Sequence, residues 1–181
     1  FFFFFFLMIR RQPRSTLSFS SAASELYKRQ VQCLVPFMKT QCFGRIINVI
    51  STSVKQPLEG LGVSNTIRGA VASWSKTVAN ELGEFGITVN NVLPGATGTE
   101  RLKEIINNKA ATLGLSFDAV AAAMKNASPA KRFAKPEEVA SAIVFLASEK
   151  ASFINGINVP VDGCLLYTYP SPRDRTRSRM P

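Results

Sequence analysis

The sequence predicts an α/β fold in which three strands form a parallel sheet with helices between them. Apolar runs of strand length occur near 44–50, 87–93 and 157–161, and helical patterns of ten or more residues separate them. Strands and helices that alternate in this way form parallel sheets. With 181 residues, 46% of them hydrophobic, the chain is long enough for one domain with a buried core. Crossovers between parallel strands are right-handed, so we expect ligands at the carboxyl ends of the strands.

The first strand is a short apolar run that starts at Gly44 and ends in the hydroxyl-rich cluster 51–53. A loop with a proline and a glycine follows it. The next stretch carries one apolar stripe with steps of three and four residues, which predicts a long amphipathic helix. Glycines at 83 and 86 end that helix. The stripe consists of Val63, Ile67, Ala70, Val71, Trp74, Val78 and Leu82.

The second strand, over 87–93, is of the buried type and breaks at a Pro-Gly pair. The stretch 100–127 predicts two short, weakly amphipathic helices rich in small residues, as in a mobile flap. Pro136 stands at a favourable first position of a helix, and the two glutamates after it suit the helix dipole. The last strand, 157–161, ends at an Asp-Gly pair.

The two ends of the chain differ in composition from the middle and carry most of the net charge of +10. Residues 1–30 hold +4 and residues 165–181 hold +3. We expect a non-native, disordered tail over 1–30, one folded α/β part over 31–163, and a second such tail over 164–181. The alternative is a pair of disordered basic tails that bind phosphate groups.

Both tails resemble translated sequencing-adapter read-through at the edges of short metagenomic contigs. The strings that carry this resemblance are FFFFFFLMIRRQPRSTLS, SSAASELYKRQ and CLLYTYPSPRDRTRSRMP. The resemblance implies that the middle of the chain is a gene fragment.

The composition excludes several kinds of chemistry and partner. The chain has no histidine, which rules out Ser-His-Asp and Cys-His catalysis and histidine zinc sites. Its three cysteines match no metal-ligand spacing, so we expect no metal and a reducing, cytoplasmic location. The apolar run at the start is about half of the roughly 20 residues that span a bilayer, so no membrane is expected. Nucleic acid is not an expected partner, because the basic excess lies in the tails.

Three strings in the middle resemble the C-terminal half of a short-chain dehydrogenase/reductase, nearest to 3-oxoacyl-acyl-carrier-protein reductases. They are GRIINVIS, LGVSNTIRGAVASWSKTVANELGEFGITVNNVLPGATGTE and PEEVASAIVFLASEKASFINGINVPVDG, and they cover essentially all of 31–163. The resemblance implies that 31–163 is the C-terminal part of one Rossmann-fold domain, with the last three strands of its doubly wound parallel sheet and their helices. It further implies NAD or NADP as cofactor, and a small carbonyl or alcohol as substrate. It also implies a homo-oligomer, a tetramer or a dimer, with the long helix as a candidate interface.

The resemblance places a catalytic serine at Ser51, which would hold the substrate carbonyl by a hydrogen bond. Further along, the family has a tyrosine acid/base and, four residues later, a lysine, where this sequence has Ser64 and Arg68. The spacing keeps both side chains on one helix face, but a serine is a much weaker acid than a tyrosine of pKa about 10. Arginine stays protonated and keeps its fork of donors. Lys55 and Glu59 are either substitute proton donors or solvated loop charges.

The resemblance also assigns residues to the cofactor. Pro94, Gly95 and Thr99 match the family's Pro-Gly-x-x-x-Thr turn, which closes over the nicotinamide and its phosphates. The hydroxyls of Thr97 and Thr99 can bind a carboxamide or phosphate oxygen. We expect Arg68 to take part in cofactor binding as well as in catalysis.

Several consequences follow for function. The Gly-rich turn that seats the pyrophosphate would precede residue 31 and is not found, so NAD and NADP stay equally open. Residues 98–130 would be the substrate lid, and the strand near 44–50 would be an unpaired apolar edge. The leading interpretation is a C-terminal fragment, itself inactive, of an NAD(P)-dependent oxidoreductase. The alternative is a non-catalytic, dinucleotide-binding or structural member of the same fold.

Overall fold

The chain folds into a four-stranded parallel sheet with helices on both faces. The structure, a computed structural model, describes residues 4–8 and 18–167, with side chains described over 29–166. The strands lie in the order β1-β2-β3-β4, and every neighbouring pair is parallel. The main elements are β1 (Phe4–Met8), α1 (Ser18–Thr40), β2 (Gly44–Val49), α2 (Gly62–Leu82), β3 (Ile87–Pro94), α3 (Glu100–Leu113), α4 (Phe117–Ala127), α5 (Pro136–Ala147) and β4 (Asn158–Val161). The predicted fold class and its three expected strands are thus confirmed.

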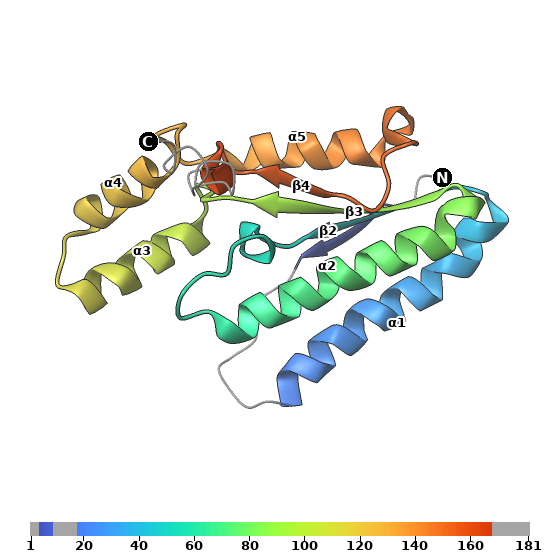
Figure 1. Ribbon diagram of the computed structural model, residues 1–181, viewed down its shortest axis with the longest axis horizontal. Helices are drawn as coiled ribbons and strands as arrows, with labels where there is room; N and C mark the ends of the chain where they lie inside the picture. Colours follow the sequence, from blue (N-terminus) through green and yellow to red (C-terminus); the bar gives the residue numbers. More distant parts are fainter. Residues whose placement is uncertain (1–3, 9–17, 168–181) are drawn as a thin grey trace, which may run out of the picture.

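Two layers of helices cover the sheet, with α1 and α2 on one face and α5 on the other (Figure 1). Successive side chains of β2 point to opposite faces, as the pleat of a strand requires. Ile46 packs in the cluster that joins α1 and α2 to the sheet. Ile47, the next residue, packs with Val139 and Leu146 of α5. Because both faces are covered, β2 and β3 are buried along nearly their whole length, which explains their continuous apolar runs.

The helices α3 and α4 lie together beyond the carboxyl end of β3 (Figure 1). They share a small core of their own, in which Leu102 and Ile106 of α3 contact Val120 and Ala121 of α4. Both helices were expected, although α3 is longer than its weak amphipathic pattern suggested. This hairpin of helices therefore forms a separate unit next to the end of the sheet.

The helix ends follow local capping chemistry. Ser116 accepts a hydrogen bond from the Ala119 amide at 3.2 Å and so caps α4. Pro136 occupies the start of α5, as expected from its fixed φ. Gly86 adopts φ 69° after α2, a left-handed conformation that suits glycine and turns the chain into β3.

The N-terminal segment differs from the disordered tail expected over 1–30. Phe4–Met8 forms β1, which pairs in parallel with Arg45–Val49, so β2 is not the unpaired edge that the sequence predicted. The helix α1 already begins at Ser18. The apolar run at the start of the chain is too short to span a membrane but long enough to form a strand. Strands pair through hydrogen bonds between backbone groups, so the composition of the run did not reveal this pairing. A short 3-10 turn, Leu165–Tyr167, likewise lies inside the second expected tail. The parts of these expectations that concern 1–3, 9–17 and 168–181 lie outside the described residues.

Candidate active site

Ser51 lies where the sequence places it, directly beyond the carboxyl end of β2. Its backbone is extended, with φ −170° and ψ 156°, and it caps the 3-10 turn Thr52–Val54. The Ser51 Oγ accepts a hydrogen bond from the Ser53 amide at 3.1 Å. Because that bond uses a lone pair of the oxygen, the hydroxyl proton of this half-buried side chain is left to be donated elsewhere.

Ser64 and Arg68 share one face of α2, and Arg68 on that face reaches the end of β2. The Arg68 Nε donates to the Ser64 Oγ at 3.1 Å, so the predicted pair is in direct contact. The Arg68 Nη1 donates to the carbonyl oxygen of Ile50, the residue that precedes Ser51. Arginine can make both bonds because its planar fork presents several donors in fixed directions. The structure therefore joins Ser64 and Arg68 to each other and ties Arg68 to the residue before Ser51, at the end of β2.

The turn after β3 forms the second part of the site. The Gly95 amide donates to the Val161 carbonyl oxygen at 3.0 Å, which ties the end of β3 to the end of β4. A Cβ atom at Gly95 would lie 2.8 Å from the Cα of Asp162, so no other residue fits without a backbone shift. Pro94, the last residue of β3, is half-buried. This close approach gives the Pro-Gly pair a packing role at the position expected to face the cofactor.

The two threonines of the turn are held by local hydrogen bonds. The Thr97 Oγ1 donates to the Gly95 carbonyl oxygen at 3.2 Å. Thr99 is the N-cap of α3, and its Oγ1 lies 3.4 Å from the Leu102 amide and 3.4 Å from the Thr97 carbonyl oxygen. Ala134 completes the turn, because its backbone bonds to both Ala96 and Gly98. Thr97 is half-buried and Thr99 is exposed. As the N-cap, Thr99 places its hydroxyl at the positive end of the α3 dipole.

The two halves of the site come from neighbouring strands, since β2 pairs with β3 in register. One set of hydrogen bonds lies around Arg68 and another lies around Thr97. Lys55 and Glu59, the alternative proton donors, are exposed. Among the described residues, no group of three metal-ligating side chains occurs, and no helix there is both long and apolar enough to cross a bilayer.

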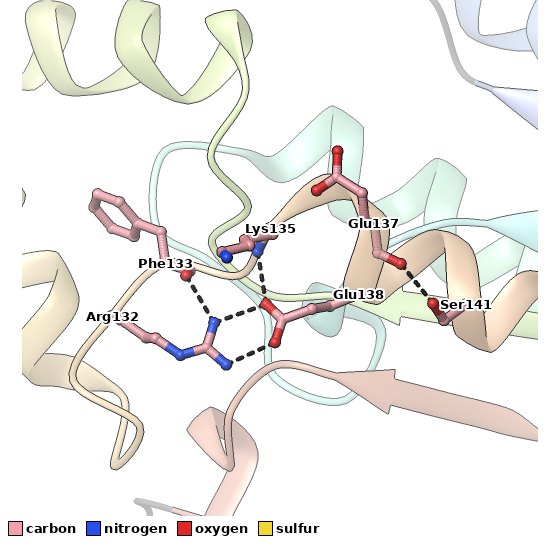
Figure 2. A network of polar contacts seen from close by, with 6 residues as sticks. All are labelled: Arg132, Phe133, Lys135, Glu137, Glu138 and Ser141. Atoms are coloured by element: carbon pink, nitrogen blue, oxygen red, sulfur yellow. Dashed lines mark hydrogen bonds and ion pairs between the residues drawn. The ribbon is translucent and has the colours of Figure 1, made fainter.

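An ion pair at the start of α5 lies near this turn and was not expected from the sequence (Figure 2). Arg132 donates to both carboxylate oxygens of Glu138 at 2.7 Å, and the Lys135 amide donates to one of them at 2.7 Å. The pKa of Glu138 is lowered to about 2, first by the hydrogen bonds from Arg132 and then by the one from the Lys135 amide. The sequence signalled only the helix dipole at Glu138, because its partner lies six residues away across an irregular connection.

Sequence reasoning also missed a buried polar network beneath the site. Asn48 of β2 and Asn91 of β3 are hydrogen-bonded to each other and to Ser75 of α2. The available signal was the presence of asparagines within otherwise apolar strands, since buried amides require partners.

Comparisons with known proteins agree with this architecture. A family model described as enoyl-(acyl carrier protein) reductase matches residues 22–165. The short-chain reductase protein NovJ of Streptomyces niveus is 36% identical over 128 residues, which cover 70% of this chain and 46% of NovJ. The NADPH-dependent reductase BacG of Bacillus subtilis (strain 168) is 32% identical over 126 residues, covering 70% and 49% of the two chains.

Solved structures give the same result. YwfH, an NADPH-dependent reductase involved in bacilysin biosynthesis, superposes with a TM-score of 0.78 at 26% identity, covering 86% of this chain and 61% of YwfH. L-sorbose reductase from Gluconobacter frateurii, in complex with NADPH and L-sorbose, has a TM-score of 0.76 at 30% identity, covering 86% of this chain and 61% of that one. The chain spans about half the length of the curated relatives it matches. It belongs to the short-chain dehydrogenase/reductase family.

Proposed function

We propose that this chain provides the substrate side of an NAD(P)-dependent oxidoreductase that acts on a small carbonyl or alcohol. The observation that carries the proposal is the convergence of Ser51, Ser64 and Arg68 at the end of β2, where Arg68 bonds both to Ser64 and to the carbonyl before Ser51. Ligands bind at this edge in open α/β sheets. Relatives named for their use of NADPH support a nicotinamide cofactor.

The residues of the turn fit such a cofactor. Thr97 and Thr99 present hydroxyl oxygens next to the N-terminus of α3, a position that favours negatively charged groups. The turn would hold the carboxamide or phosphate oxygens there, with Pro94 and Gly95 fixing its path. When bound, the nicotinamide supplies or accepts the hydride.

The polar groups around Ser51 would act on the substrate oxygen. Ser51 donates its hydroxyl proton to the carbonyl oxygen, because its own lone pair is already engaged by the Ser53 amide. Arg68 bonds to Ser64 in the same manner, which leaves the Ser64 proton directed away from the guanidinium. Arg68 contributes a fixed positive charge that favours negative charge on the oxygen. Proton transfer then passes through Ser64, with water as the relay, in place of a phenol.

A second candidate is a dinucleotide-binding member without catalysis. One observation favours it: the Arg68 guanidinium is committed to a backbone carbonyl and to Ser64, which are structural contacts. In that case Arg68 holds α2 against β2, and no group of suitable acidity transfers a proton.

The test supplies the chain with a nucleotide-binding half. We propose that the chain alone turns over no substrate, because the Gly-rich phosphate turn is not found in its sequence. A chimera would join the nucleotide-binding half of BacG ahead of residue 31 and be assayed for NADPH and NADH oxidation with small ketones and aldehydes. Turnover supports the oxidoreductase. Cofactor binding without turnover supports the second candidate, and the absence of both contradicts the two proposals.

A double substitution separates the candidates further. Ser64→Tyr with Arg68→Lys, made in the same chimera, restores the residues that the family carries. If the chimera is active only after this change, the native Ser64 and Arg68 do not support catalysis. A native chimera that already turns over, and that the double change accelerates by less than about tenfold, or 1.4 kcal/mol, supports catalysis without a phenol at position 64.

A further inference from the structure

Three asparagines form a ladder across the strands of the sheet. Asn48 of β2 pairs in register with Asn91 of β3, and Asn91 pairs with Asn158 of β4. The Asn48 Nδ2 donates to the Asn91 Oδ1 at 3.0 Å, and the Asn91 Nδ2 donates to the Asn158 Oδ1 at 2.8 Å. Asn48 and Asn91 are 2% and 3% exposed, so these amides are withdrawn from water. Each bond runs between side chains at the same level of the sheet.

Ser75 of α2 closes the ladder from the helix layer. Its Oγ, fully buried, accepts from the Asn48 Nδ2 at 2.9 Å and lies 2.9 Å from the Asn91 Oδ1. The same oxygen lies 2.7 Å from the Val71 carbonyl oxygen, so its single proton is shared between two acceptors. No other helix of the described chain is joined to the ladder by a side-chain hydrogen bond.

Ser75 lies on the same face of α2 as Ser64 and Arg68 of the candidate site. It follows Ser64 by eleven residues and Arg68 by seven, which at 3.6 residues per turn puts all three within about 40° of one another. Two residues of this face are hydrogen-bonded to the sheet. Ser75 bonds to the asparagines, and Arg68 bonds to the Ile50 carbonyl oxygen. Ser64 lies beyond Arg68 on this face, near the start of α2.

We propose that the ladder closed by Ser75 is a positioning device for the candidate site, an inference that rests on the proposed function. It sets the register of β2, β3 and β4 and the rotation of α2, and so holds Ser64 and Arg68 over the end of β2. Both β2 and β3 are buried on two faces, so apolar pattern alone distinguishes registers poorly. A slip by one residue, or a turn of α2, leaves buried amides without partners, and that is strongly disfavoured.

The test uses the full chain and observes Arg68 directly. Exchange of the Arg68 Nε–H with water is followed by nuclear magnetic resonance, and its rate is divided by that of the slowest backbone amides of β3. This ratio separates positioning from general stability, because a variant that merely unfolds more often raises both rates together. Ser75→Ala removes the contact, Ser75→Thr restores the hydroxyl, and Ser73→Ala, on the exposed side of α2, is the matched control.

We expect Ser75→Ala to raise the exchange ratio by about tenfold, since the Arg68–Ser64 bond loosens while the sheet stays closed. Ser75→Thr should return it to within about twofold of the wild-type ratio, and Ser73→Ala should leave it unchanged. An unchanged ratio in Ser75→Ala, or equal rises in both rates, overturns the positioning role. The exchange ratio is measured without cofactor or substrate. If the chimera is inactive but Ser75→Ala changes the ratio in the full chain, the proposed function is refuted and the positioning role of the ladder is supported.

Discussion

The turn at Gly95 offers a sharp test of the packing at the site. A Cβ atom added there would lie 2.8 Å from the Cα and 2.9 Å from the Cβ of Asp162. The first of these is a backbone atom of the residue that follows β4, so rotation of a flexible side chain cannot relieve the contact. Overpacking of this kind costs about 1–3 kcal/mol. For a chain of this size, about 2 kcal/mol corresponds to a melting temperature lower by about 4–8 °C.

The matched control is the second glycine of the same turn. A Cβ atom at Gly98 would lie 3.5 Å from the Ala134 carbonyl oxygen, an ordinary contact. Gly98→Ala should therefore change the free energy of unfolding by less than about 0.5 kcal/mol. Thermal unfolding followed by circular dichroism compares both variants with the wild type. If Gly95→Ala melts together with Gly98→Ala, β3 and β4 do not approach as described.

Three further variants test separate parts of the fold. Arg68→Ala removes charged donors from a carbonyl and a hydroxyl, so urea unfolding should show a loss of about 1.5–3 kcal/mol, and an unchanged midpoint would refute the contact. Gly86→Ala forces a left-handed backbone and sets a Cβ 2.5 Å from the Cys42 carbonyl oxygen, so a loss of at least about 2 kcal/mol is expected in the same assay; wild-type stability would contradict it. The depressed pKa of Glu138 makes its contribution to stability fully present above its ordinary value of 4.5 and lost as pH falls through about 2. Carboxyl titration by nuclear magnetic resonance should give that low value, and Arg132→Ala should raise it; the same pKa in both proteins would exclude the ion pair.

Much of the fold could be predicted from the sequence because its local signals agree with one another. The apolar runs, the stripe of α2 and the proline at the start of α5 each gave the right element, and their alternation gave the parallel sheet. The contact between Ser64 and Arg68 also followed from sequence, since a spacing of four residues brings side chains together on any helix.

What could not be predicted depends on contacts between distant segments. Position 95 must be glycine because Asp162 lies so close to it, and Glu138 is bonded to Arg132. In both cases an irregular connection separates the two residues, and no periodic pattern in the sequence predicts its path. The pairing of β1 with β2 was missed because composition says little about which backbone groups meet. The asparagine ladder depends on strand register, which is decided only when the sheet assembles.

The proposed function requires Ser51 as the donor to a substrate oxygen, and one variant tests this directly. In the chimera with a nucleotide-binding half, Ser51→Ala should lower kcat for ketone reduction by about 100-fold, as expected for the loss of one aligned donor. The Kd for NADPH should stay within about twofold, because Ser51 lies just beyond the end of β2 and not on the turn after β3. A Ser51→Ala protein that keeps the wild-type kcat would contradict the account.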